Sequence, residues 1–406
     1  MKSPRQVGPR SQANYGGKSG GIAIDATPLQ TEHRFRGPGT YTAGLLDALT
    51  RLPHPAPISL LLQAPHPDDL PLAADLPARA GITIIPLHRP RWRRDHLQWL
   101  LGLLAVRPAL HRARPRIYHA TEPDGLVLVP GVVTVATLYD LIPLRHPAAH
   151  FPPRRFDQRI GYARYLRLLQ RADRLIAISE ATKCDAVQRL GIAPERIAVT
   201  PLAADERYFY PRPAQEVEAV TGRYGVHRPY FLHVGASTYH KNTARVLQAF
   251  DLFSRECSAD HALYIAGKWI PQALAELETS YPALVQAGRL RVLGFIPDDD
   301  LPALYCGADA LVYPSLIEGF GLPVLEAMRC GIPVLTSTTS SLPEVGGDAA
   351  LYVDPHDVGA IAAALCKLAS QPSLRADLSL RGLQRAEMFS WACTAEQTLR
   401  VYEELF

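Results

Sequence analysis

The sequence predicts an α/β protein of two doubly wound, Rossmann-like domains, each with a parallel sheet covered by helices on both faces. Short runs rich in β-branched and aromatic residues alternate with helical patterns along most of the chain, and such alternation is typical of βαβ units. The thirteen candidate strands are too many for one comfortable sheet. A polar, proline-bearing stretch, "ADERYFYPRPAQ" at 204–215, separates seven of them from the other six.

The two domains are predicted over residues 22–203 and 204–388, with a cleft between them. The strands expected in the first are "GIAIDA", "SLLLQA", "ITIIPL", "RIYHAT", "VVTVATLYD", "DRLIAIS" and "RIAVTPL". Helical patterns such as "TAGLLDALTRL", "FDQRIGYARYLRLLQRA" and "EATKCDAVQRLG" lie between several of them. The second domain has "PYFLHVGAS", "HALYIAGK", "LRVLGFI", "ALVYPS", "IPVLTS" and "ALYVD". Ligands of such sheets bind where strands run into helices, at the carboxyl ends of the strands.

The bulk composition excludes several classes of protein. Of 406 residues, 47% are apolar and 20% are charged, as in soluble globular domains. The net charge of +4 comes from four basic residues in an acid-free stretch that ends near Gly21; without them, 39 basic residues (43 minus 4) balance 39 acidic ones. A neutral body argues against nucleic-acid binding, and the basic tail 1–21 is expected to be disordered.

The six cysteines are scattered, with no CxxC pair and no histidine at zinc-ligand spacing. This pattern favours free thiols in a reducing compartment over a disulfide framework or a metal site. No run reaches the 18 or so apolar residues that span a bilayer. We therefore expect a cytoplasmic protein without a metal or a cofactor.

The first unusual loop, "RFRGPGTYTAGLL", follows the first strand and leads into a helix expected to start near Thr40. Gly37 and Gly39 flank a proline, and Thr40 is a good N-cap. Glycines in such a loop let a ligand approach the backbone, and a helix start offers N–H groups to an anion. A plain turn and a phosphate-facing loop both fit this stretch.

The second loop, "HVGASTYHKNTARVL", places Gly235 at the end of a strand and Lys241 just before a helix. A lysine at this point can hold a phosphate as a point charge beside the helix start. A solvated lysine fits the loop equally well.

The third loop, within "EGFGLPVLEAMRCGIPV" at 318–334, places two carboxylates eight residues apart. Pro323 suits a first helical turn, and Gly331 suits the position just after the helix. Glu318 is thus expected outside the helix start and Glu326 one turn inside it.

The same loop offers the backbone N–H groups of Phe320, Gly321 and Leu322 as free donors. Carboxylates accept hydrogen bonds from hydroxyls, and the N–H groups together with Lys241 suit a diphosphate. The three loops together therefore indicate a sugar nucleotide rather than two unrelated surface acids.

Residues 230–355 resemble the donor-binding domain of family 4 glycosyltransferases, retaining enzymes of GT-B fold. The resemblance rests on "VGASTYHKN", "LYIAGK", "LPEVGGDAALYVDP" and the stretch from "LRVLGFIPDDDLPALYCGADALVYPS" through "LIEGFGLPVLEAMRCGIPVLTS". The Glu-x7-Glu pair is among its most specific signatures. A looser likeness through "GPGTY", "YHATEP" and "VATLYDLIPLRHP" extends it over most of the chain. By analogy, the final helix within 389–406 crosses back onto the first domain.

The resemblance implies a role for each matching position. Glu326 would bind the ribose hydroxyls, Glu318 the transferred sugar, and Lys241 the diphosphate. The catalytic residues implied are Glu318, Lys241, Tyr139 and Asp140. The donor-binding residues implied are Gly37, Gly39, Gly235, Ser237, His240, Asn242, Gly294, Phe295, Gly319, Phe320, Gly321, Leu322 and Glu326.

Two positions depart from the family pattern. Many relatives have an arginine just after the glycine or just before the lysine of the second loop, where this chain has Ala236 and His240. Neutralisation of the diphosphate would then depend on Lys241, on His240 if protonated, and on backbone donors. Many relatives also have His-Asp where this chain has Tyr139-Asp140. A tyrosine can donate a hydrogen bond but cannot be a cation.

The function implied is metal-independent, retaining transfer of a sugar from a nucleotide diphosphate to a carbohydrate or lipid-linked acceptor, in polysaccharide or glycolipid synthesis. Similarity to bacterial polysaccharide mannosyltransferases favours GDP-mannose, and UDP-sugars stay open. A nucleotide-sugar epimerase of the same architecture is an alternative. A degenerate partner subunit is another: the missing arginine and histidine favour it, and the intact Glu318, Glu326 and Lys241 oppose it.

The stretch 88–116 holds eight arginines and a single acid, Asp95. Four leucines recur at helical spacing, with Trp92 and Trp99 near the basic end. An ordinary helix packed on the first sheet explains this pattern. A peripheral contact with the inner membrane surface, with arginines on anionic head groups, also explains it.

Overall fold

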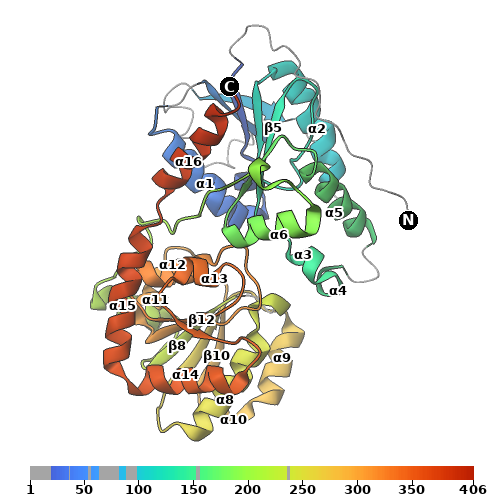
Figure 1. The fold of residues 1–406 in the computed structure, drawn as a ribbon. Coiled ribbons are helices and arrows are strands. Elements are labelled where there is room, and N and C mark those ends of the chain that lie inside the picture. Colours follow the sequence, from blue (N-terminus) through green and yellow to red (C-terminus); the bar gives the residue numbers. More distant parts are fainter. Residues whose placement is uncertain are drawn as a thin grey trace.

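The computed structural model describes residues 20–35, 37–53, 56–63, 82–87, 98–151, 156–235 and 238–406. These residues form two parallel sheets, one above the other in Figure 1, each with helices packed against it. All thirteen expected strands are present. The predicted fold class is therefore confirmed.

The first sheet has seven strands in the order β3-β2-β1-β4-β5-β6-β7. They are β1 (Ile22–Asp25), β2 (Ile58–Gln63), β3 (Thr83–Leu87), β4 (Ile117–Ala120), β5 (Val133–Leu138), β6 (Arg174–Ala177) and β7 (Ile197–Val199). The helices around it are α1 (Gly37–Leu49), α2 (Gln98–Ala113), α3 (Ile142–Arg145), α4 (Pro147–His150), α5 (Phe156–Leu169) and α6 (Glu180–Leu190). Three short 3-10 turns, η1 (Thr27–Gln30), η2 (Glu32–Phe35) and η4 (Pro194–Arg196), complete it.

The second sheet has six strands in the order β10-β9-β8-β11-β12-β13. They are β8 (Tyr230–Val234), β9 (Ala262–Ala266), β10 (Leu290–Gly294), β11 (Ala310–Tyr313), β12 (Val334–Ser337) and β13 (Leu351–Val353). The helices are α7 (Ala214–Arg223), α8 (Thr243–Glu256), α9 (Pro271–Ser280), α10 (Pro282–Gln286), α11 (Leu301–Gly307), α12 (Leu322–Arg329), α13 (Leu342–Gly346), α14 (Val358–Ser370), α15 (Pro372–Glu387) and α16 (Trp391–Glu403). The turn η5 (Tyr239–Lys241) lies just before α8.

The central strands are buried on both faces, as parallel strands between helix layers require. Every residue of β1, β4, β9, β11 and β12 is buried. Their side chains are mostly Ile, Val, Leu and Ala, which explains why the strands read as continuous apolar runs instead of alternating ones.

The C-terminal helix α16 packs against α1 of the first domain (Figure 1). A Cβ atom on Gly44 would come within 2.2 Å of the Trp391 ring, so the indole lies directly on the helix backbone. The Tyr402 hydroxyl lies 2.6 Å from Nδ1 of the buried His119 on β4. Helix α16 thus packs on the first domain, as expected.

The bounds of α12 agree with its local sequence signals, whereas the start of α1 does not. Pro323 lies in the first turn of α12, and Gly331, with φ of 74°, follows its end, as predicted. The helix expected to start near Thr40 starts at Gly37, so Thr40 lies inside its first turn and the prediction of an N-cap is wrong.

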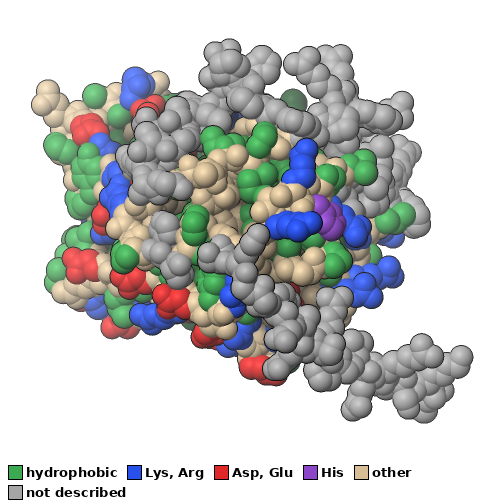
Figure 2. Space-filling model, turned by 90° about the horizontal axis from the view of Figure 1, so that it is seen from above, with side chains coloured by type: hydrophobic (Ala, Val, Ile, Leu, Met, Phe, Trp, Pro, Cys, Tyr) green, Lys and Arg blue, Asp and Glu red, His purple; other side chains and the backbone are tan. Residues whose placement is uncertain are grey.

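Within the described residues, no helix is both long enough and apolar enough to cross a membrane. Helix α2 packs on the sheet through Ala105, Val106, Ala109 and Leu110, whereas Leu104 is 64% exposed. The other exposed side chains at its C-terminal end are mostly basic: Arg107, His111, Arg112 and Arg114. Figure 2, which views this end of the molecule, shows basic side chains gathered on one side. Trp92 and the arginines at 89–94 lie outside the described residues.

Candidate active site

The second and third loops meet at the point where the strand order of the second sheet reverses. The loop after β8 (235–242) and the loop after β11 (314–321) leave neighbouring strands at their carboxyl ends. They are joined by a hydrogen bond of 2.8 Å from the Leu316 N–H to the His240 carbonyl. Such a switch point is the usual ligand-binding place of a doubly wound sheet.

Lys241 and Glu318 form an ion pair at this point. Lys241 Nζ lies 2.9 Å and 3.1 Å from the two carboxylate oxygens of Glu318 and also contacts the Tyr313 hydroxyl. The Tyr313 hydroxyl donates to Glu318 Oε1 at 2.8 Å. Burial raises the pKa of Glu318, but the charge and the hydrogen bonds of Lys241 act together with His240 and Ser315 to hold the pKa below its ordinary value. Glu318 is therefore a charged hydrogen-bond acceptor at neutral pH.

Glu326 lies on α12, only eight residues after Glu318 in the sequence, but it has a different environment. The Tyr305 hydroxyl donates to Glu326 Oε2 at 2.9 Å and fixes one side of the carboxylate. Burial raises the pKa of Glu326 to about 7, and the Tyr305 hydrogen bond only partly opposes this. Between the two pKa values, Glu318 is thus mostly charged while Glu326 is mostly protonated.

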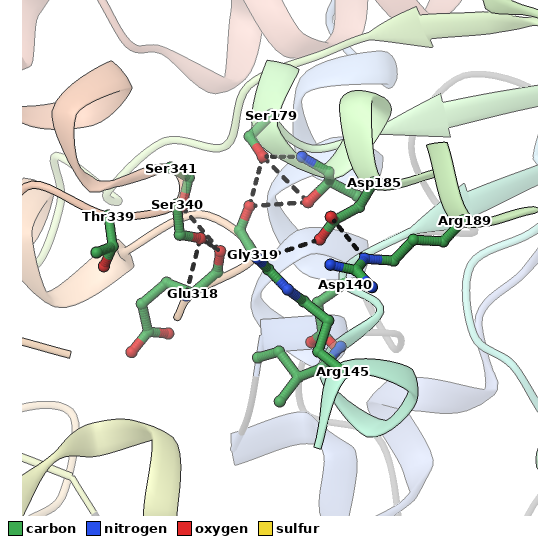
Figure 3. A network of polar contacts seen from close by, with 12 residues as sticks. Asp140, Arg145, Ser179, Asp185, Arg189, Glu318, Gly319, Thr339, Ser340 and Ser341 are labelled. Carbon is green, nitrogen blue, oxygen red and sulfur yellow. Dashed lines mark hydrogen bonds and ion pairs between the residues drawn. The ribbon is translucent and has the colours of Figure 1, made fainter. Parts of the chain in front are cut away.

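The backbone of the third loop is held through its carbonyl groups. The Glu318 carbonyl accepts hydrogen bonds from the hydroxyls of Ser340 and Ser341 (Figure 3), and the Phe320 carbonyl accepts from Ser341 at 2.7 Å. Among the described residues, no hydrogen bond engages the N–H groups of Gly319, Phe320 or Gly321. The loop therefore presents unengaged donors next to a helix start.

The first domain faces this loop closely. A Cβ atom on Gly319 would come within 2.1 Å of the Tyr139 carbonyl oxygen, so only glycine fits at this contact. The Tyr139 hydroxyl donates to the Thr121 carbonyl at 2.6 Å. Its single O–H is thus engaged inside the first domain, which gives no support to a direct contact of Tyr139 with a sugar.

Asp140 caps the turn that follows β5. Its carboxylate accepts a hydrogen bond of 2.9 Å from the Ile142 N–H. Burial raises the pKa of Asp140, with a contribution from nearby Glu318. Asp140 is thus close enough to Glu318 for their charges to interact.

The second loop touches the first domain through His240. The rings of His240 and His150 stack with their centroids 6.2 Å apart. Burial and the neighbouring Lys241 lower the pKa of His240 to about 4. At neutral pH His240 is therefore uncharged and does not replace the missing arginine as a cation.

Asn242, which was expected to touch the donor, supports the loop instead. Its side-chain amide donates to the carbonyls of Pro314 and Pro355 at 2.9 Å and 2.7 Å. Its carbonyl oxygen accepts from Arg245 at 3.0 Å. The residue has φ of 59° and is 3% exposed, so it fixes the turn between Lys241 and α8.

Three of the predicted glycines, Gly37, Gly39 and Gly294, differ in how closely they are packed. A Cβ atom on Gly39 would come within 2.4 Å of the Arg34 backbone, so this glycine allows the chain to pack closely against Arg34. Cβ atoms on Gly37 and Gly294 would meet nothing within 4 Å. Next to Gly294, Phe295 is 46% exposed, and Lys268 Nζ lies 5.2 Å from its ring centroid. Ala236 and Ser237 lie outside the described residues.

A polar cluster at the carboxyl ends of β1 and β4 was missed by sequence reasoning. Thr27 Oγ1 lies 2.7 Å from Asp25 Oδ1 and 2.8 Å from Glu122 Oε1. His33 Nδ1 lies 3.0 Å from Glu122 Oε2. The first sheet also reverses its order between β1 and β4, so this cluster occupies the switch point of the first domain. The only signal was the acid after the strand "RIYHAT".

Two hollows of about 530 and 580 Å³ lie elsewhere, at the amino ends of the strands of the second sheet, and share His227 and Arg228. Neither includes a predicted site residue. The chemistry described above is therefore not located there.

Comparison with known proteins gives a consistent picture. Residues 35–208 match the family model "Glycosyltransferase Family 4", and residues 223–385 match "Glycosyl transferases group 1". An O-antigen chain mannosyltransferase B of Escherichia coli is 37% identical over 240 residues, 58% of this chain and 62% of that protein. The serotype-specific mannosyltransferase WbdA of Escherichia coli is 28% identical over 95% of this chain and 48% of that protein. The chain thus spans about half to two thirds of the length of these relatives.

Solved structures agree on the fold. HepE of Anabaena, determined in complex with UDP and glucose, superposes with a TM-score of 0.71 at 18% identity, over 95% of this chain and 100% of that one. Sucrose-phosphate synthase of Thermosynechococcus elongatus gives a TM-score of 0.75 at 20% identity, over 95% and 99%. With both domains matched by the family models, this chain belongs to the family 4 glycosyltransferases of GT-B fold.

Proposed function

We propose that the protein transfers mannose from GDP-mannose to an acceptor hydroxyl, with retention of anomeric configuration. The observation that carries the proposal is the Lys241–Glu318 pair at a switch point, beside three N–H groups that make no hydrogen bond within the described part of the chain. Mannose is supported by relatives that are named mannosyltransferases, among them the O-antigen protein and WbdA. Their names also support a role in polysaccharide synthesis.

The donor would lie along the carboxyl edge of the second sheet. Glu326, held by Tyr305, would accept hydrogen bonds from the ribose hydroxyls. Phe295 offers an exposed ring on which a base can stack. Lys241 uses its three donors on Glu318 and Tyr313, so binding a diphosphate through Nζ requires it to exchange one of these partners.

The reaction would proceed on one face of the sugar. The bond from the anomeric carbon to the phosphate oxygen breaks as the bond to the acceptor oxygen forms, and the acceptor proton passes to the departing phosphate. Lys241 and the N–H groups of Phe320 and Gly321 would stabilise the negative charge that grows on that phosphate. Glu318, charged at neutral pH, would orient the sugar through its hydroxyls.

The acceptor would approach from the first domain. Glu122, only 3% exposed and fixed by Thr27 and His33, offers a side-chain oxygen as an acceptor to an incoming hydroxyl. A lipid-linked acceptor would suit the exposed Leu104 and the basic side chains of α2, which support a peripheral membrane contact. A cytoplasmic location follows from the cysteine pattern as a prediction.

A ligand screen tests the proposal. Thermal shift against GDP-, UDP- and ADP-sugars should show stabilisation by the GDP-sugar, since a ligand at about 100 times its dissociation constant adds about 2.7 kcal/mol. Glu326→Ala should weaken binding of the free nucleotide by roughly 1.5–3 kcal/mol. Glu318→Ala should lower turnover and leave that affinity largely intact. The reverse pattern would show that the two acids are assigned wrongly.

A further inference from the structure

The start of helix α6, in the first domain, forms hydrogen bonds with the third loop, which belongs to the second domain. The Ser179 hydroxyl donates to the Gly319 carbonyl at 2.6 Å (Figure 3). The Thr182 hydroxyl lies 3.1 Å from the same oxygen. Ser179 and Thr182 are 0% and 3% exposed, so water does not compete for these contacts. The Gly319 carbonyl is thus held by side chains 140 and 137 residues away in sequence.

A second contact between the two domains involves the same helix start. Glu344, on α13 of the second domain, accepts hydrogen bonds from the N–H groups of Glu180 and Ala181 at 2.9 Å and 3.3 Å. A carboxylate at the first turn of a helix is favourable because these N–H groups have no partner within the helix. The two domains are therefore fixed to each other at α6 through both a carbonyl and a carboxylate.

The hydrogen bonds to the Gly319 carbonyl also fix the direction of the N–H of the next residue, Phe320. A peptide unit is planar and trans, so its C=O and N–H point in opposite directions. With the Gly319 carbonyl turned toward α6, the Phe320 N–H must point away from α6. No hydrogen bond of the described chain uses that N–H.

From this geometry we infer that Ser179 and Thr182 are positioning residues, which aim the Phe320 N–H at the phosphate or sugar of the bound donor. The inference rests on the proposed function. It means that the donor site, although built from the second domain, is complete only while the first domain holds the Gly319 peptide. Ser179 thus helps to orient a donor-binding N–H group without touching the donor itself.

A simpler role for Ser179 must be separated from this one. Ser179 is also the N-cap of α6, because its Oγ accepts a hydrogen bond of 3.0 Å from the Thr182 N–H. Capping needs only an acceptor, whereas positioning needs the O–H donor. Ser179→Asp keeps a strong cap and removes the donor, and Ser179→Thr keeps both.

The chain supplies a matched control for loss of a cap. Ser390 caps α16 in the same way, accepting 3.1 Å from the Cys393 N–H, and does not touch the third loop. Ser390→Ala should lower the melting temperature and leave kcat unchanged. Any fall in kcat beyond this control then reflects the loop.

The experiment measures kcat, KM and melting temperature for the full-length variants with the sugar nucleotide that stabilises the wild type. Ser179→Ala and Ser179→Asp should lower kcat about tenfold, less than the loss on deleting an oxyanion donor outright. Ser179→Thr should stay within about threefold of wild type. A wild-type kcat for Ser179→Asp, or a Ser179→Ala variant that loses only melting temperature, would overturn the inference.

Hydrogen exchange provides a readout that does not need activity. The Glu318 N–H, which donates to Ser340 Oγ at 3.0 Å and is therefore protected, should exchange faster in Ser179→Asp than in wild type or Ser179→Thr. If the wild type transfers no sugar but this difference persists, the proposed function is wrong, and the conclusion that Ser179 holds the third loop is supported. Equal exchange in all three proteins would show that the Ser179 hydroxyl does not hold the third loop.

Discussion

The Lys241–Glu318 pair gives the sharpest energetic prediction, through the substitution Lys241→Met. Methionine keeps the length and apolar stem of lysine and removes its charge. Glu318 would then remain charged in a buried place without its cationic partner, although the Tyr313 hydroxyl still donates to it. Removing one member of a buried pair is costly because it leaves an uncompensated charge.

The exposed fractions of the two side chains set the magnitude. Lys241 is 19% exposed and Glu318 is 10% exposed. Breaking a fully buried pair costs about 3–5 kcal/mol, whereas exposed pairs contribute about 0–1 kcal/mol. We therefore expect the free energy of unfolding to fall by about 3 kcal/mol, the lower end of the buried range.

Urea denaturation at pH 7 measures this value. The double variant Lys241→Met, Glu318→Gln also removes the charge that Lys241→Met leaves at position 318, so it should be at least about 1 kcal/mol more stable than Lys241→Met alone. Lys367→Met, at an exposed position of α14, should change stability by less than about 0.5 kcal/mol. If Lys241→Met behaves like this control, the pair is a surface contact and the reasoning is refuted.

The pH dependence has a defined sign. The pKa of Glu318 is lowered in the folded protein, so the stability it contributes is present above its ordinary pKa and is lost as pH falls through the lowered value. The difference in stability between wild type and Glu318→Gln should therefore shrink in acid. A difference that grows in acid would contradict this sign.

Three further predictions concern ligands. Nucleotide affinity should rise as pH increases through about 7, because burial raises the pKa of Glu326 to about 7 and the charged form is the better acceptor; calorimetry should find this dependence lost in Glu326→Gln, and a flat wild-type profile would refute it. Activity should survive EDTA, since Lys241 and the loop N–H groups supply the positive charge; a strict need for magnesium or manganese would overturn the mechanism. Wild type should sediment with anionic liposomes at low salt, and changing Arg91, Arg93 and Arg94 together to Ser should abolish this, at about 1 kcal/mol per arginine; equal sedimentation of both proteins would leave only a packing helix.

Much of the fold could be predicted because its signals are local. Each strand is a short apolar run, and the two parallel sheets follow from the alternation of these runs with helical patterns. Pro323 and Gly331 mark the start and the end of α12 through backbone constraints that act within a turn. The prediction that Thr40 is the N-cap of α1 is wrong because a good capping residue also fits inside the first turn. Here a Gly-Pro-Gly segment starts the helix earlier, at Gly37.

The partners of the site residues could not be predicted in the same way. The ion pair of Lys241 with Glu318 joins residues 77 positions apart, and the hydrogen bond of Tyr305 to Glu326 depends on how α11 packs beside α12. The amide of Asn242 could have faced a ligand, but two nearby carbonyls use both of its donors. These choices are made by tertiary packing, on which a sequence motif carries no information.

The stereochemistry of the product tests the central claim most directly. Wild-type protein would be incubated with the stabilising sugar nucleotide and a simple mannoside acceptor, and the products followed by proton NMR. The account predicts a new glycoside with the same anomeric configuration as the donor, formed together with free nucleoside diphosphate. A glycoside of inverted configuration, or a new free sugar nucleotide with no glycoside, would contradict it.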